Sequence, residues 1–144
     1  MKKIITIAIM GIILTSCASK TVFKDPEPKS GEFYFWPVWI KDKKARFDSL
    51  YTIKNLTDKH IIIFTEDINC KRSEAKGSII HKTKKTQLAL RPQEFINLIS
   101  ICKLGKRVQG EMKISITKIY DNPSKDGRTI GKVIQENVVW TRAD

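Results

Sequence analysis

The chain is poor in the residue types that build most catalytic and metal sites. It has two histidines and three cysteines among 144 residues. No Cys-x-x-Cys or His-x-x-x-His pair occurs, and no serine lies in a Gly-x-Ser-x-Gly sequence. The carboxylates are scattered among lysines, without the spacing of a paired acid and base. We therefore expect a protein that is not an enzyme and that holds no metal or cofactor.

Long apolar runs are also absent, except for one at the N-terminus. Lys2 and Lys3 precede a run of eleven mostly apolar residues, 4–14, and two small residues lead from it to Cys17. A membrane-spanning helix needs about 20 apolar residues, so this run is too short to span. A positive start, a short apolar stretch and small residues are typical of a secretory signal, which we assign to residues 1–16.

The end of this signal resembles a known class. The sequence "LTSC" at residues 14–17 is similar to the lipobox of bacterial lipoproteins. The resemblance implies a diacylglycerol on the Cys17 thiol, cleavage before Cys17 and a further acyl chain on the new amino group. Two or three acyl chains anchor a protein stably, whereas one chain binds reversibly. Ala18 and Ser19, with no Asp after the cysteine, resemble the pattern that implies sorting to the outer membrane of the bacterial envelope. The alternatives are an ordinary secretory signal with a chance cysteine, or an uncleaved anchor.

Processing would leave 144 − 16 = 128 residues, with 27 − 2 = 25 basic and 15 acidic side chains, a formal charge of +10. This length fits one domain of about 100 residues and a tether. We assign the lipidated tether to residues 17–31, because Pro26 and Pro28 prevent a continuous helix or a central strand there. An extended tether of this length could hold the domain up to about 45 Å from the anchor.

Residues 32–144 have the pattern of an all-β domain. Apolar residues alternate with polar ones over 108–117, as in a strand with one buried face. "EFINLISICKL" (94–104) and "HIIIF" (60–64) are apolar on both faces, which is typical of strands covered on both sides. Turn formers separate about seven such segments, so we predict a β-sandwich. The pattern over residues 33–142 resembles immunoglobulin-like domains of bacterial surface proteins, which implies architecture only.

The two remaining cysteines form an even set. With Cys17 lipidated, an oxidising compartment permits a Cys70–Cys102 disulfide. Closing a loop of about 33 residues would stabilise the fold by roughly 3.5 kcal/mol in the chain-entropy model. Free thiols, or a metal or redox role, are the alternatives.

An aromatic segment, "FYFWPVWI", occupies residues 33–40. Pro37 lacks an amide donor, which favours an edge strand. If both faces are covered, the segment belongs to the core. If Tyr34 and Trp36 or Trp39 are exposed, they form a flat platform suited to sugar rings, a partner protein or the lipid interface.

Basic side chains gather at three places in the sequence. Such charge attracts anionic lipid headgroups, cell-wall polymers or acidic envelope proteins, although a generally solvated lysine-rich surface would look the same. Nucleic acid is not an expected partner, because the predicted compartment separates the chain from it. The three clusters are Lys41, Lys43, Lys44 and Arg46; Lys82, Lys84 and Lys85; and Lys103, Lys106 and Arg107.

These features predict a non-catalytic binding or structural module of the envelope, attached to the membrane through Cys17. One alternative is a lipid-anchored inhibitor or immunity protein against an acidic partner, which would carry its charge on a protruding loop at 71–77 or 121–129. The other is a small hydrolase, which needs a cleft that joins His60 or His81 to two carboxylates. We expect both histidines at the surface.

Overall fold

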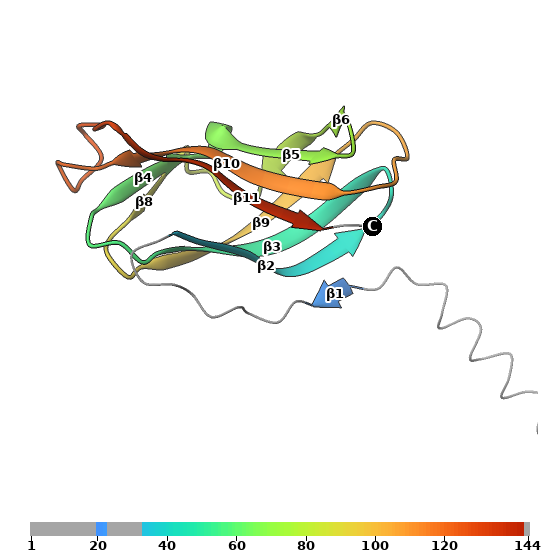
Figure 1. The fold of residues 1–144 in the computed structure, drawn as a ribbon, viewed down its shortest axis with the longest axis horizontal. Helices are drawn as coiled ribbons and strands as arrows, with labels where there is room; N and C mark the ends of the chain where they lie inside the picture. The colour runs from blue at the N-terminus through green and yellow to red at the C-terminus, as the bar shows by residue number, and fades with distance from the viewer. Residues whose placement is uncertain (1–19, 23–32, 143–144) are drawn as a thin grey trace, which may run out of the picture.

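Two antiparallel β-sheets pack face to face in the computed structural model, which describes residues 20–22 and 33–142 (Figure 1). Sheet A has the order β1-β2-β3-β9-β7, made of β1 (Lys20–Val22), β2 (Phe33–Asp42), β3 (Arg46–Asn55), β9 (Phe95–Lys103) and β7 (Ser78–His81). Sheet B has the order β6-β5-β10-β4-β8, made of β6 (Ala75–Lys76), β5 (Ile68–Arg72), β10 (Met112–Asp121), β4 (Ile61–Phe64) and β8 (Gln87–Leu90), and β11 (Val133–Arg142) pairs with β10. The predicted all-β sandwich is confirmed.

The described residues form eleven strands, more than the seven or so that were predicted. The additional strands are short: β1 has three residues, β6 has two, and β7 and β8 have four each. Strands of this length are too short to show an alternating pattern in the sequence. One 3₁₀ turn, η1 (Thr65–Asp67), joins β4 to β5. Within the described ranges no helix has the length and hydropathy needed to cross a membrane. The likeness to immunoglobulin domains stays a prediction.

Strand β10 organises sheet B. On one side it pairs with β11 along most of its length. On the other side its first half pairs with β5 and its last two residues pair with β4. Met112, Ile114 and Ile116 are buried, which confirms the alternation predicted for this strand. Because β11 pairs only with β10, it is an edge strand of sheet B.

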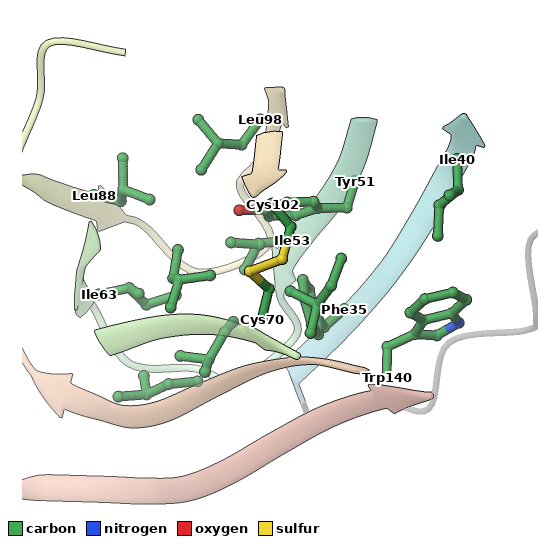
Figure 2. Close-up of a cluster of buried hydrophobic side chains, with 14 of the residues drawn as sticks. Phe35, Ile40, Tyr51, Ile53, Ile63, Cys70, Leu88, Leu98, Cys102 and Trp140 are labelled. Atoms are coloured by element: carbon green, nitrogen blue, oxygen red, sulfur yellow. A yellow bond between two sulfur atoms is a disulfide. The ribbon is translucent and has the colours of Figure 1, made fainter. Parts of the chain in front are cut away.

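The core lies between the sheets and contains the predicted disulfide (Figure 2). Cys70 on β5 and Cys102 on β9 are joined with a Cα–Cα distance of 6.1 Å, so the bond ties sheet B to sheet A. Tyr51 and Ile53 from sheet A and Ile63 from sheet B are fully buried in the same cluster. The prediction of a Cys70–Cys102 bridge is confirmed.

The chain passes from sheet B to sheet A at Gly77, between β6 and β7. The Gly77 amide donates to the Cys70 carbonyl at 2.9 Å, which holds the crossover against the disulfide. A Cβ built on Gly77 would overlap the sulfur atoms of both Cys70 and Cys102. Glycine is therefore required at this position by space, because any side chain would displace the disulfide or the crossover.

A buried ion pair joins the two sheets at the end of the sandwich that holds the β2–β3 hairpin. The side chain of Arg72 on β5 is 0% exposed, and its Nη1 lies 2.7 Å from Asp42 Oδ1 on β2. Arg72 Nε donates to the Gly110 carbonyl at 3.1 Å, and the Lys44 amide donates to Asp42 Oδ1 at 2.8 Å. Burial raises the pKa of Asp42, but the bonds from Arg72 and Lys44 outweigh it, so this pKa lies below its usual value.

Part of the predicted tether belongs to sheet A. Lys20–Val22 forms β1, which pairs antiparallel with β2 in the register Lys20↔Lys41 and Val22↔Trp39. Figure 1 shows β1 as a short strand along the outside of β2. The predicted tether, 17–31, is thus not free over its whole length. Cys17 lies outside the described residues, but it precedes Lys20 by only three positions, a reach of about 11 Å rather than about 45 Å.

Candidate functional site

A groove of about 620 Å³ crosses the outer face of sheet B. It runs over β5, β10 and β11 and ends at the Gly77 crossover. None of the residues that line it is acidic. The side chains that give it polar character are Asn69, Lys71, Lys76, Lys113, Ser115, Thr117 and Asn137.

Three lysines stand side by side in this groove, and we call them the lysine row. The register places Lys71 opposite Lys76 on one side and opposite Lys113 on the other. Directly opposed residues on antiparallel strands have Cβ atoms about 4.5–5.5 Å apart, and like charges at this spacing destabilise a sheet. None of the three lysines forms an ion pair with a described residue. An anion in the groove would relieve this repulsion.

An irregular backbone position lies at the same groove. Asn137 on β11 has φ of 53°, in the left-handed region that non-glycine residues rarely adopt. Asparagine tolerates this conformation better than most residues, because its short polar side chain bonds locally. The Thr117 hydroxyl across the groove donates to the Asp67 carbonyl at 3.2 Å. The groove therefore combines a positive row with uncharged amide and hydroxyl groups, which suits an anionic ligand that also carries hydrogen-bonding groups.

Sequence reasoning did not find this groove. The alternation over 108–117 did predict that Lys113, Ser115 and Thr117 point away from the core, and Ser115 and Lys113 do line the outer face. The lysine row, however, depends on the pairing of β10 with β5 and of β5 with β6. The only signal in the sequence was the lysine on each of these segments, at positions 71, 76 and 113.

Comparison with known proteins gives no match. No protein-family model, no curated sequence and no solved structure matches this chain.

The aromatic segment that was predicted as a core element or a platform divides between the two. Phe35, Pro37 and Ile40 are buried, whereas Tyr34, Trp36 and Trp39 are each half-buried. Trp36 packs edge-to-face against Trp140 of β11, with ring centroids 6.5 Å apart. Trp39 is opposite Val22 of β1, with Lys20 Nζ 4.4 Å from its ring centroid. Tyr34 is opposite Lys54 on β3. The part of β2 around Pro37 pairs only with β3 among the described strands, as an edge strand does.

The predicted lysine cluster, Lys82, Lys84 and Lys85, lies away from the aromatic segment. Lys82, Lys84 and Lys85 are exposed in the loop that joins β7 to β8. Strand β7 is at one edge of sheet A, and the β1–β2 pair that holds Trp39 is at the other edge. The structure therefore does not bring these lysines together with Tyr34, Trp36 or Trp39.

His81 is half-buried, and its ring hydrogen-bonds to buried side chains, which the prediction of a surface histidine did not include. Its Nδ1 lies 2.8 Å from Ser100 Oγ, and Ser100 Oγ lies 2.9 Å from the Tyr51 hydroxyl. Because the Thr65 carbonyl can only accept, the 3.2 Å contact from Nε2 places the proton on Nε2 and leaves Nδ1 to accept from Ser100. Burial lowers the pKa of His81, partly offset by the bond to Thr65, and burial raises the pKa of Tyr51.

This network is a structural link rather than an open site. Ser100 is 1% exposed and Tyr51 is 0% exposed, so a substrate cannot reach the serine oxygen beside His81. The described ranges also contain no group of three His, Cys, Asp or Glu side chains that could hold a metal ion. Sequence reasoning missed the network because its members come from positions 51, 65, 81 and 100.

Proposed function

We propose that this protein is a lipid-anchored, non-catalytic binding module of the bacterial envelope, which holds an anionic partner in the groove of sheet B. The observation that carries the proposal is the lysine row. Three like charges at adjacent cross-strand positions cost the sheet stability when the groove is empty. A bound carboxylate, phosphate or sulfate group converts that repulsion into attraction.

The assignment to the envelope rests on the N-terminus and on the disulfide. The "LTSC" sequence before the described residues supports acylation of Cys17. The buried Cys70–Cys102 bond is of the kind that persists in exported proteins, where thiols are not kept reduced. An anchor at Cys17 attaches to the chain just before β1, in sheet A. The groove is on the opposite sheet, so the anchor leaves it open to a partner.

The two alternatives have less support. An inhibitor would carry its charge on a protruding loop, but residues 71–77 run from β5 through β6 into the crossover, with their lysines in the groove. In the other candidate loop, Arg128 is paired with Asp126 at 3.2 Å. A hydrolase would need an accessible histidine beside two carboxylates, and His81 does not supply it, because its ring contacts Tyr51, Ser100 and Thr65.

The anchor is tested by mass spectrometry of the protein purified from its native membrane. The expected mature chain begins at Cys17 and carries acyl groups on its sulfur and its amino nitrogen. A chain that retains residues 1–16, or a Cys17 with a free thiol, would refute the anchor.

The groove is tested by capture of partners from the native envelope with the anchored protein. We expect Lys71→Glu/Lys113→Glu to reduce capture at least tenfold, a loss of about 1.4 kcal/mol or more in binding free energy. The matched control is Lys82→Glu/Lys84→Glu, which makes the same charge change on the β7–β8 loop and should leave capture unchanged. The double variant still has a like-charge pair between positions 71 and 113, so an unchanged circular dichroism spectrum is required to show that lost capture does not reflect unfolding. Lys71→Glu alone replaces both like-charge contacts of Lys71 with opposite-charge contacts, so it should also reduce capture and should raise thermal stability by about 0.5 kcal/mol. Equal capture by both double variants would refute the groove.

A further inference from the structure

Every strand of sheet A contributes at least one apolar side chain to the outer face of the sheet. The register aligns Val22, Trp39, Leu50 and Ile99 in one cross-strand row, and Ile101 and Ile80 in the next. We call these six side chains the apolar face. Val22 is 73% exposed, Ile80 43% and Ile99 38%. Large apolar side chains gathered in this way on one sheet mark an interaction surface more often than a free surface.

This exposure corrects the prediction for residues 94–104. Their apolar residues on both faces predicted a strand covered on both sides. The inner face is covered, since Leu98 and Cys102 are buried, but Phe95 and Ile99 on the outer face are exposed. Strand β9 is an inner strand of sheet A, between β3 and the edge strand β7, so its outer side chains do not lie at the sheet edge. The outer face of β9 thus has the apolar composition of a buried surface, although no described residue covers that face.

Basic side chains border the apolar face. The same register that aligns the apolar rows puts five basic residues on the outer side of sheet A and one acidic residue, Asp48. Asp48 is already paired with Lys43 and Arg46, at 3.4 Å each. The border therefore attracts anions, and a purely apolar partner would not account for these basic residues. The five basic residues are Lys20, Lys41, Arg46, Lys54 and Lys103.

The chain reaches this face from the anchor. Lys20 pairs with Lys41 at the margin of the apolar face, and Cys17 is three positions earlier, within about 11 Å. Acyl chains on Cys17 would hold this margin against the bilayer. Trp39 lies at the same margin beneath Lys20. Tryptophan and lysine are suited to the membrane interface, because each has an apolar body and a polar end.

We propose that the apolar face rests on an anionic lipid bilayer, with its basic border among the headgroups. The proposal builds on the lipid anchor of the proposed function and adds an orientation to it. Three features favour an anionic bilayer as the occupant of this face: the short connection from Cys17 to β1, the apolar centre and the positive border. With sheet A on the lipid, the groove of sheet B faces away from the membrane.

The orientation is tested by lysine footprinting of the full, lipidated protein in phosphatidylcholine vesicles with and without phosphatidylglycerol. A membrane-impermeant amine reagent labels lysines, and mass spectrometry compares each site with the protein in detergent. We expect labelling of Lys41 and Lys103 to fall at least fivefold in anionic vesicles, since each basic residue near an anionic surface favours contact by about that factor. Lys71 and Lys76, on the opposite sheet, should label as in detergent.

Two matched variants separate the faces. Ile80 and Val139 are each 43% exposed, on the outer faces of sheets A and B. Ile80→Glu should restore labelling of Lys41 and Lys103, whereas Val139→Glu should not. An intact disulfide and an unchanged circular dichroism spectrum confirm that each variant is folded.

The outcomes that would overturn the inference are distinct. Equal labelling of both sheets by a protein that is acylated and bound to vesicles would refute the orientation but leave the anchor intact. Failure to bind either kind of vesicle would refute the anchor itself. Protection of Lys41 and Lys103 in detergent that grows with protein concentration would show that a second copy of the chain covers the face.

Discussion

Replacement of Asp42 by asparagine tests the buried ion pair that joins the two sheets. Asparagine has the same shape as aspartate and keeps one oxygen acceptor for Arg72. It removes the negative charge that compensates the Arg72 guanidinium, whose side chain is 0% exposed. The substitution therefore isolates the charge from the packing.

The magnitude follows from the burial of the two partners. Removing one member of a buried ion pair costs about 3–5 kcal/mol, because the other charge is left without compensation. Asp42 is 25% exposed and asparagine still accepts a hydrogen bond, which places the loss near the lower end, at about 3 kcal/mol. With an m-value of about 1.5 kcal/mol/M, the urea midpoint would fall by about 2 M.

The pH dependence gives a second measurement of the same interaction. The pKa of Asp42 is lowered in the folded protein, so its ionised form stabilises the fold above the unfolded-state pKa of about 3.9. That contribution is lost as the pH falls through the lower, folded-state pKa. Asp42→Asn cannot titrate, so its stability should change less than that of the wild type over this acidic range.

Urea denaturation followed by tryptophan fluorescence measures both effects. Asp58→Asn is the control, because Asp58 is exposed in the β3–β4 turn and its loss should change stability by no more than about 0.5 kcal/mol. Adding Arg72→Met to Asp42→Asn should recover at least about 1 kcal/mol relative to the sum of the single changes. A loss below about 1 kcal/mol for Asp42→Asn, or strictly additive effects in the double variant, would contradict the assigned role.

Three further substitutions test other links in the fold. His81→Gln should reduce the fall in urea midpoint between about pH 7.5 and pH 5. The lowered pKa of His81 makes the wild type lose stability as the pH drops below about 6.5, and glutamine cannot titrate. An equal fall in urea midpoint in both proteins would refute this role of His81. Gly77→Ala should lower the free energy of unfolding by about 2–3 kcal/mol, because the new Cβ overlaps the disulfide. The control is Gly105→Ala, where φ is 76° and nothing lies within 4 Å of the new Cβ, so the cost should be only about 1 kcal/mol. Thermal melts that show the larger loss for Gly105→Ala would refute the packing argument. Cys102→Ala with Cys70→Ala should lower the unfolding free energy by about 3.5 kcal/mol, which chemical denaturation measures, and no change would mean that the bond adds nothing to stability.

Local patterns in the sequence were sufficient for much of the fold. Alternation predicted the inward side chains Met112, Ile114 and Ile116, because one face of β10 is buried and the other is not. The run "HIIIF" predicted a strand covered on both faces, and Ile62 is fully buried on the side where Gly127 of the β10–β11 loop lies against it. The disulfide was predicted by pairing the two cysteines left over, without any geometry.

The features that depend on strand register could not be predicted in this way. Arg72 has the sequence context of a surface residue, and its burial depends on partners far away in the sequence, among them Asp42, thirty positions earlier, and the Gly110 carbonyl. The lysine row likewise requires three particular strands to be neighbours. Strand β1 has three residues and no pattern of its own, and its pairing with β2 is a tertiary contact.

The glycine crossover also predicts an order of events during oxidative folding. Cys70 is 5% exposed and Cys102 is 1% exposed, and Gly77 lies directly over both sulfur atoms. Thiol–disulfide exchange needs a thiolate to approach a sulfur, so the closed crossover shields the bond from reductants and isomerases. We expect the bond to form before the crossover closes, and to resist dithiothreitol until a denaturant lifts the crossover away. Alkylation of the two thiols, followed over time with and without urea, would reveal that protection directly.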